Sequence, residues 1–290
     1  MSNRFDRLHP LVSFCYFAGS ITLLLAMLHP LFLGAAFVAV LAVTFIYDHG
    51  GNLRKWTVFI VISGLFIAIL NPVFNERGRH VLFVAYNHRF SLEAILIGGM
   101  NALSLMSIIA LFVTYNEVMT PNKLLFLFSK IFPQFAVLLM LTLRFIPLMR
   151  RRLEEISAVQ ASKGIYVTDG KLRDRVKNGM LYVQVLLTYS LEEAIQTADS
   201  MKARKYGTGR RTSYEYFIFT KTDLAALFYL LILFGTVLYG RIKGLGYLNV
   251  YPLMEPLSLS PQEGVTFVLF LLFFIFPFVV EVGGRIRWRL

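Results

Sequence analysis

The chain has 290 residues, of which 57% are hydrophobic and only 16% are charged, and its formal net charge is +12. This composition excludes an ordinary soluble domain, which would carry more charge and shorter apolar runs. Cys15 is the only cysteine, so the chain can form neither an internal disulfide nor a cysteine metal site. The positive charge could suit nucleic acid, but Lys and Arg also collect on the cytoplasmic side of membrane proteins.

Apolar segments dominate both ends of the chain. A bilayer core about 30 Å thick needs about 20 apolar residues in a helix. The first segment follows Arg4 and Arg7 and could be a signal peptide, but its length and the prompt start of a second segment favour a retained helix. We therefore predict an all-α polytopic membrane protein with about six transmembrane helices, of which the third is the shortest: Leu11–Leu28, Leu31–Tyr47, Trp56–Leu70, Leu92–Tyr115, Leu224–Tyr239 and Val265–Val282.

Charge divides the chain into three regions. Residues 1–115 form an N-terminal membrane domain of about four helices, residues 116–212 a basic insert, and residues 213–290 the last two helices. Between Arg144 and Arg211 the insert holds fourteen Lys or Arg residues. If the N-terminus is cytoplasmic, 24 of the 29 basic residues lie inside and 5 outside. The positive-inside rule therefore predicts cytoplasmic termini and a cytoplasmic insert.

The long loop from Asn71 to Ser91 should lie on the outer face. Its β-leaning run Val81–Tyr86 suggests a small hairpin or lid. His80 and His88 share this loop, but two histidines eight residues apart are weak evidence for a metal site, since zinc takes three or four ligands. We expect no metal or cofactor bound by this chain.

The insert begins with two predicted helical segments. Thr120 and Pro121 suit an N-cap and a first helical position. After Pro133, the apolar run Phe135–Leu143 is too short to span a bilayer alone. A seventeen-residue span ending at Arg150 is the alternative, and the charge count opposes it. We predict a long helix, half-buried against the membrane domain and kinked at Pro147.

A third helix is predicted from about Arg173 to Tyr206. Near its end an apolar face recurs at helical spacing and contains small residues that allow close helix approach: Leu191, Ala194, Ile195, Ala198 and Met201. Gly207 stands where a helix-ending glycine is expected.

Each of the two long helices of the insert ends in a short motif, Ser162-Lys163-Gly164 and Ala203-Arg204-Lys205. Both place a small residue just before a cation near a helix C-terminus. The helix dipole favours a cation there, which explains the pattern without any partner. The alternative is a cationic plug that docks in a partner's groove and reaches buried carboxylates through a charge-assisted bond of about 1.5–3 kcal/mol.

Catalytic motifs are missing from the sequence. There is no HExxH, no GxSxG and no P-loop pattern, so we expect a non-catalytic chain that does not bind ATP through a P-loop itself. Asn71, Asn101 and Glu117 lie at or near spans but form no obvious catalytic constellation. Binding of acidic lipid or RNA by the basic insert is a further alternative.

Four segments of the insert resemble the transmembrane T component of energy-coupling factor transporters, the EcfT/CbiQ family: Thr120–Leu125, Leu141–Pro147, Gln160–Gly164 and Ala198–Gly207. The resemblance is strongest over residues 116–212. The two signature triplets of that family read Ala-Arg-Gly or close variants. Here the first has Ser and Lys in place of Ala and Arg, and the second has Lys in place of Gly. Because Lys cannot make the planar two-pronged contact of Arg, the first contact should be weaker or differently aimed.

The resemblance implies a function. Members of the family couple two cytoplasmic ABC-type ATPases, which use ATP and Mg²⁺, to a small membrane S component that captures a vitamin or a transition-metal ion such as cobalt or nickel. No nucleic acid is involved, and the expected location is the cell membrane of a bacterium or archaeon.

The resemblance also assigns roles to residues. Lys163 and Arg204 anchor the two ATPases, while Ser162, Gly164, Ala203 and Lys205 shape the docking ends. Arg144 and Pro147 hold and bend the helix, and the S component rests on the apolar faces of Leu124–Ile131 and Phe135–Leu143. A conventional ABC permease subunit is the main rival, but Glu193-Ala194-Ile195 only begins like the loop of that class and no matching glycine follows.

Overall fold

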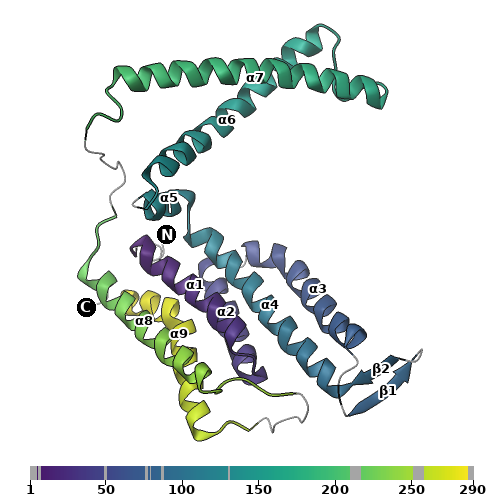
Figure 1. Ribbon diagram of the computed structural model, residues 1–290, viewed down its shortest axis with the longest axis vertical. Helices are drawn as coiled ribbons and strands as arrows, with labels where there is room; N and C mark the ends of the chain where they lie inside the picture. The colour runs from purple at the N-terminus through teal and green to yellow at the C-terminus, as the bar shows by residue number, and fades with distance from the viewer. Residues whose placement is uncertain are drawn as a thin grey trace. The chain divides into compact units, whose positions relative to one another are not determined.

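A computed structural model describes residues 5, 8–48, 51–75, 78, 80–85, 88–129, 131–209, 217–250 and 258–286. Several residues in the charge count, among them Arg4, Arg7, Arg77 and Arg211, lie outside this described part. The described residues form nine helices and one two-stranded hairpin (Figure 1): α1 (Pro10–Ala26), α2 (Pro30–Asp48), α3 (Gly51–Phe74), β1 (Val81–Ala85), β2 (His88–Ser91), α4 (Leu92–Val118), α5 (Pro121–Ser129), α6 (Pro133–Ser162), α7 (Leu172–Ala203), α8 (Lys221–Ile242) and α9 (Pro261–Ile286).

Within the described residues, six helices are long and apolar enough to cross a membrane: α2, α3, α4, α6, α8 and α9. This confirms an all-α polytopic membrane protein. The third predicted segment was placed too short, since α3 has 24 residues and continues through Pro72. The six helices that qualify differ from the six predicted spans in two cases. Helix α6 meets the length and composition required, and α1, with 17 residues, is slightly short.

Helices α1 and α6 differ in how deeply their side chains are buried. Val12, Tyr16 and Leu23 of α1 are fully buried, whereas the 30 residues of α6 include only two buried ones, Ala136 and Ile156. Thus α1 is a central member of the helical bundle although it is short. The helix α6 runs without interruption through Pro147, and a kink there stays a prediction.

The chain forms two compact units: Met1–Leu124 with Phe217–Leu290, and Leu125–Tyr216. The predicted limits of the three functional domains, at residues 115/116 and 212/213, stay a prediction. Residues just beyond 115 belong to the core of the first unit, where Val118 and Met119 are buried and the Lys123 ammonium donates to the Val118 carbonyl at 2.8 Å.

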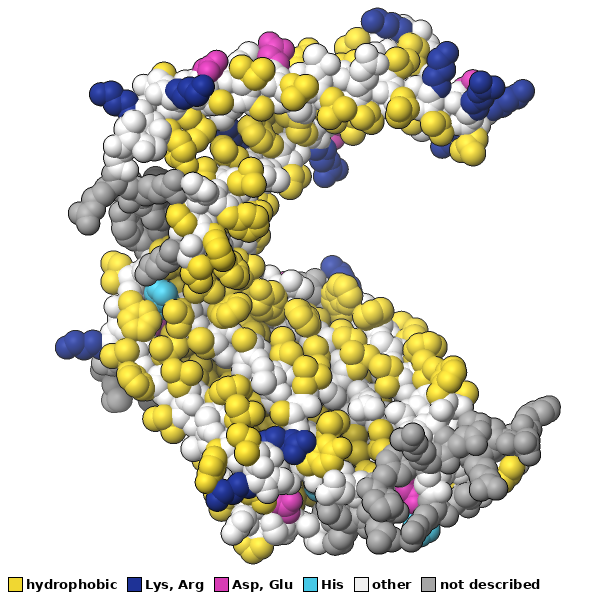
Figure 2. Space-filling view, viewed as in Figure 1, with side chains coloured by type: hydrophobic (Ala, Val, Ile, Leu, Met, Phe, Trp, Pro, Cys, Tyr) yellow, Lys and Arg dark blue, Asp and Glu magenta, His cyan; other side chains and the backbone are white. Residues whose placement is uncertain are grey.

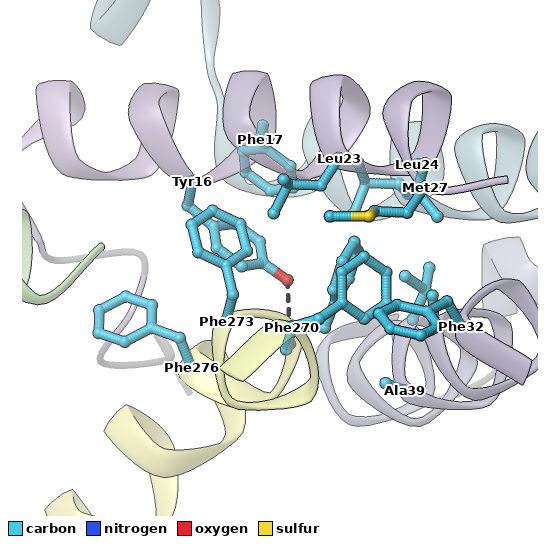
Figure 3. Packing of buried hydrophobic residues seen from close by; sticks show 14 of the residues in the cluster. Tyr16, Phe17, Leu23, Leu24, Met27, Phe32, Ala39, Phe270, Phe273 and Phe276 are labelled. Carbon is cyan, nitrogen blue, oxygen red and sulfur yellow. Dashed lines mark hydrogen bonds between the residues drawn. The ribbon is translucent and has the colours of Figure 1, made fainter. Parts of the chain in front are cut away.

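An aromatic core holds the first unit together (Figure 3). Tyr16 of α1 stacks on Phe273 of α9 with ring centroids 5.7 Å apart, and its hydroxyl donates to the Phe274 carbonyl at 3.2 Å. On the neighbouring pair of helices, the buried hydroxyls of Thr44 in α2 and Thr114 in α4 share a hydrogen bond of 2.8 Å. These buried hydroxyl groups are thus paired, as a low-dielectric interior favours.

Two identical Leu-His-Pro-Leu segments begin α1 and α2, a repeat that our sequence analysis missed. The Nδ1 atoms of His9 and His29 accept the N–H groups of Leu11 and Leu31 at 3.2 and 3.3 Å. Burial lowers the pKa of His29, against a smaller opposing effect of a nearby carboxylate. A lowered pKa keeps the ring neutral, as an Nδ1 acceptor requires.

The predicted hairpin is confirmed: β1 and β2 pair antiparallel. Glu93, in the first turn of α4, is buried and accepts the backbone N–H and the Nδ1 of His80 at 3.1 and 2.9 Å. The side chain of His88 lies outside the described part, and a role of the hairpin as a lid stays a prediction. Among the described residues no group of three or more metal-ligating side chains occurs.

Candidate functional site: two cationic helix ends

The first motif forms the C-terminal end of α6. Within Ser162–Gly164, the serine is the last helical residue, the lysine is the C-cap and the glycine has a φ of +73°. The N–H groups of Gly164 and Ile165 donate to the carbonyls of Ala161 and Gln160, both at 3.0 Å. This pair of bonds is the Schellman motif, which requires a left-handed residue just after the cap and therefore favours glycine.

The second motif ends α7 with the same hydrogen bonds. The N–H groups of Lys205 and Tyr206 donate to the carbonyls of Lys202 and Met201, both at 2.9 Å. Here the left-handed residue is Lys205, with a φ of +59°. The predicted helix limit at Tyr206 and the predicted stop at Gly207 were therefore wrong by a few residues, because a lysine occupies the conformation that we assigned to a glycine.

A third helix end provides a comparison. Helix α8 has Lys243 as its C-cap and Gly244 at φ +88°, and the N–H groups of Gly244 and Leu245 donate to the carbonyls of Arg241 and Gly240 at 2.9 and 3.0 Å. A cation on a Schellman cap is therefore a recurrent way for this chain to end a helix. The cap geometry alone does not distinguish a docking site. The exposure, ion pairing and neighbouring side chains of the first two ends therefore have to be considered.

Both motifs are exposed over all three residues, and within the described residues neither Lys163 nor Arg204 forms an ion pair. Helix α7, which separates them, is not among the helices apolar enough to cross a membrane.

Three side chains of α7 hold the chain that follows the first end. Tyr182 Oη donates to the Ile165 carbonyl at 2.8 Å, Asn178 Nδ2 to the Tyr166 carbonyl at 2.8 Å, and Arg175 Nε to the Val167 carbonyl at 3.0 Å. We call these three residues, Arg175, Asn178 and Tyr182, the α7 ladder. The ladder was not predicted from the sequence, although the i, i+3, i+7 spacing of its three donors on one helix face is visible there.

The ladder sets the distance between the ends. Because the first end is tied to residues 175–182 and the second follows residue 203, they are separated along α7 by roughly 30–45 Å at 1.5 Å per residue. That distance is too large for one small pocket and suits two separate contacts.

Helices α6 and α7 also contact each other before the first end. Ser190 Oγ donates to Met149 Sδ at 3.1 Å, and the guanidinium of Arg152 lies 5.5 Å from the Tyr189 ring centroid while its Nη1 pairs with Glu155 at 2.8 Å. This contact, together with the ladder, fixes α6 against α7.

The other two predicted site residues are not brought to the ends. Arg144 and Pro147 are exposed on α6, about four to five turns before Lys163. The Arg144 guanidinium lies 5.2 Å from the ring of Phe145. Their assigned roles in holding and bending the helix stay predictions.

Apolar side chains cover the middle of α7, while Lys and Arg gather toward its two ends (Figure 2). The predicted apolar face lies on this helix and is not buried within the described residues: Leu191 is 67% and Ile195 63% exposed. On α6, Phe135, Leu138 and Met140 are similarly exposed.

Together these features define a class: a multi-pass membrane protein with an inserted helical unit that carries two exposed cationic ends. Residues 5–214 match the family model of CbiQ, described as cobalt transport protein. The chain therefore belongs to the CbiQ family, which confirms the resemblance drawn from the motifs.

Curated relatives agree. The chain is 33% identical over 109 residues to the energy-coupling factor transporter transmembrane protein EcfT of Lactobacillus helveticus, covering 37% of this chain and 39% of the relative. It is 28% identical over 109 residues to EcfT of Bacillus subtilis, and 30% identical over 109 residues to EcfT of Listeria innocua, each covering 37% of this chain and 41% of the relative. The match thus spans about two fifths of these relatives.

Proposed function

We propose that this chain is the T component of an energy-coupling factor importer. It transmits the ATP-driven motion of two cytoplasmic ABC-type ATPases to a membrane S component, which captures a vitamin or a transition-metal ion. The chain itself performs no catalysis in this scheme. The observation that carries the proposal is the pair of exposed cationic ends, which are built alike and lie far enough apart along α7 to serve two partner subunits. Because α7 is not among the helices apolar enough to cross a membrane, we place both ends on the same side.

The geometry suits docking into grooves. A Schellman cap turns the chain away after the cation, so a small residue and a cation form the blunt end of the helix. Ser162 and Ala203 leave that end narrow, and neither cation has an ionic partner within the described residues. A carboxylate in a partner's groove would complete each contact with a charge-assisted hydrogen bond.

Charge supports a cytoplasmic position for both ends. With cytoplasmic termini, 24 of the 29 Lys and Arg residues fall on the inner side. If α6 crossed the membrane as well, this count would be lost, since either the insert or the first four helices would change sides. The basic side chains of the second half of α6, Arg150, Arg151 and Arg152, also disfavour a crossing.

The insert has an exposed apolar surface that suits contact with the S component. Ile131–Phe135 line an open hollow of about 390 Å³ at the start of α6, and Phe135, Leu138 and Met140 continue this surface along the helix. An apolar membrane protein is the partner that such a surface fits. We place the S component on this surface.

Co-purification from membranes tests the proposal. A tagged chain should retain two ABC-type ATPases and a small apolar protein in mild detergent, and Lys163→Glu/Arg204→Glu should lose the ATPases. The matched control is Lys243→Glu, which reverses the cation on the third Schellman cap, expected on the opposite side of the membrane, and should leave retention intact. If wild-type chain retains no ATPases, or if the double variant retains them fully, the T-component function is wrong and a conventional permease subunit or a stand-alone carrier takes its place.

A further inference from the structure

The α7 ladder is the feature that the proposed function does not yet use. We propose that Arg175, Asn178 and Tyr182 are positioning residues that aim the first cationic end at its ATPase. This inference rests on the proposed function. It concerns how one of the two contacts is preorganised, and none of the three side chains is required to touch the ATPase.

The direction of the three bonds supports positioning. Successive donors along α7 reach successive carbonyls in reverse order, so that residues 175, 178 and 182 bind 167, 166 and 165. The chain leaving the first end is therefore laid antiparallel along α7. Three bonds to three consecutive carbonyls fix the path of that segment rather than a single point of it.

Burial indicates that one of the three residues holds the first end more strongly than the other two. Tyr182 is only 7% exposed and is the buried residue of α7, whereas Arg175 is exposed and Asn178 is half-buried. Its bond also joins the chain closest to the cation, since Ile165 completes the Schellman cap around Lys163. A hydrogen bond shielded from water is stronger than an exposed one. Loss of the Tyr182 hydroxyl should therefore loosen the first end more than loss of either other donor.

The second end has no such support within the described residues. The bonds recorded just beyond its cap are local, from the N–H and hydroxyl of Thr208 to the Lys205 carbonyl at 3.3 and 2.8 Å. The two ends thus differ in preorganisation. Binding by a group that is already held in place loses less conformational entropy than binding by a mobile one. The ladder compensates at the first end for Lys163, which lacks the planar fork of arginine.

Spin-label mobility can measure the ladder without any partner. In a Cys15→Ser background, labels at Thr168→Cys and Gly209→Cys report the exposed chain after the first and second ends. Tyr182→Phe should increase label mobility at 168 at least twofold and leave 209 unchanged. The matched control is Tyr189→Phe, the same change on the same helix at a tyrosine whose ring packs beside Arg152 and whose hydroxyl forms no hydrogen bond to any residue that the structure describes, and it should alter neither label.

ATPase binding in nanodiscs gives the second readout. Tyr182→Phe should weaken retention of the ATPases about fivefold, the effect of one typical hydrogen bond. Arg175→Met should do so more weakly, and Arg175→Lys, which keeps a donor, should restore binding. A general folding defect would move both labels and would not be rescued by lysine.

Two results overturn the inference while leaving the proposed function intact. One is unchanged mobility at 168 in Tyr182→Phe and Arg175→Met. The other is increased mobility at 168 with undiminished ATPase retention, while Lys163→Glu/Arg204→Glu still releases the ATPases. If wild-type chain retains no ATPases although the label at 168 responds to Tyr182→Phe, then the proposed function has failed and the docking role of the ladder fails with it.

Discussion

The first and second cationic ends have the same backbone and different chemistry. Each closes its helix with the same two Schellman hydrogen bonds, between 2.9 and 3.0 Å long. The first combines a lysine at the cap with a glycine in the left-handed position and a ladder of side chains behind it. The second combines an arginine at the cap with a lysine in the left-handed position and only local bonds beyond it.

We infer from this comparison that the shape of a helix end and the strength of its contact with an ATPase depend on different residues. The cap sets the shape of the helix end, and because the α8 end has the same cap, this shape alone does not distinguish a docking site. The strength of the contact with an ATPase depends on the cation and on how firmly the helix end is held. We infer that the second end relies on the better cation, and the first on the firmer support.

Charge reversal at the cap should have the largest effect. Arg204→Glu should weaken ATPase binding by roughly 2–3 kcal/mol or more, because it removes a charge-assisted bond and places a carboxylate against the partner's carboxylates. Lys163→Glu should act in the same direction and less strongly, since lysine makes the weaker contact. Titration of the ATPases onto nanodisc-embedded chain measures both, with Lys243→Glu as the control. Equal losses for the two variants would contradict the ranking of the ends.

Substitution of the left-handed glycine should weaken the first end by a smaller amount. Gly164→Ala should destabilise the last turn of α6 by about 1 kcal/mol, because a side chain is unfavourable at φ +73°. An added Cβ would meet no atom within 4 Å, so the cost comes from the backbone alone. Hydrogen exchange at the amides of Gly164 and Ile165 should become about fivefold faster. Unchanged exchange would mean that the cap tolerates alanine there.

The reverse substitution should tighten the second end. Lys205→Gly relieves a lysine held at φ +59° and should stabilise the last turn of α7 by about 0.5–1 kcal/mol. Exchange at the amides of residues 205 and 206 should slow by a few-fold, and Gly209→Ala, outside the cap, is the control. Faster exchange would show that the Lys205 side chain stabilises the end by a contact that outweighs its backbone strain.

The sequence predicted the ends better than it predicted their details. A small residue before a cation near a helix terminus is a local pattern, and the structure places both motifs at helix C-termini, with Ser162 and Ala203 as the last helical residues, although the second helix was predicted to continue to Tyr206. The left-handed residue of the second end was assigned to Gly207 because lysine has no preference for that conformation. The structure instead has Lys205 in that position of the cap, with a φ of +59°.

Long-range features were the least predictable. The donors of the α7 ladder are visible in the sequence, but their acceptors are backbone carbonyls whose positions depend on the path of residues 165–167. Likewise, the sequence predicted the first apolar segment as a membrane span, whereas by helix length α6 qualifies and α1 is slightly short, and burial shows that α1 lies inside the bundle. Periodicity identifies helices, but it does not say which of them share a core.

The smallest effect tests whether lysine at the first cap is a deficit or a requirement. Lys163→Arg keeps the charge and adds the planar fork that matches a carboxylate, so ATPase binding should be unchanged or up to about twofold tighter. The position is exposed, so the larger side chain meets no steric barrier within the chain. Combined with Tyr182→Phe, the same change should recover part of the affinity that the ladder variant loses, because a stronger cation would offset a looser end. A clear loss with Lys163→Arg alone would mean that the groove at the first end is shaped for an ammonium, and that the two ends recognise their ATPases by different chemistry rather than by different strength.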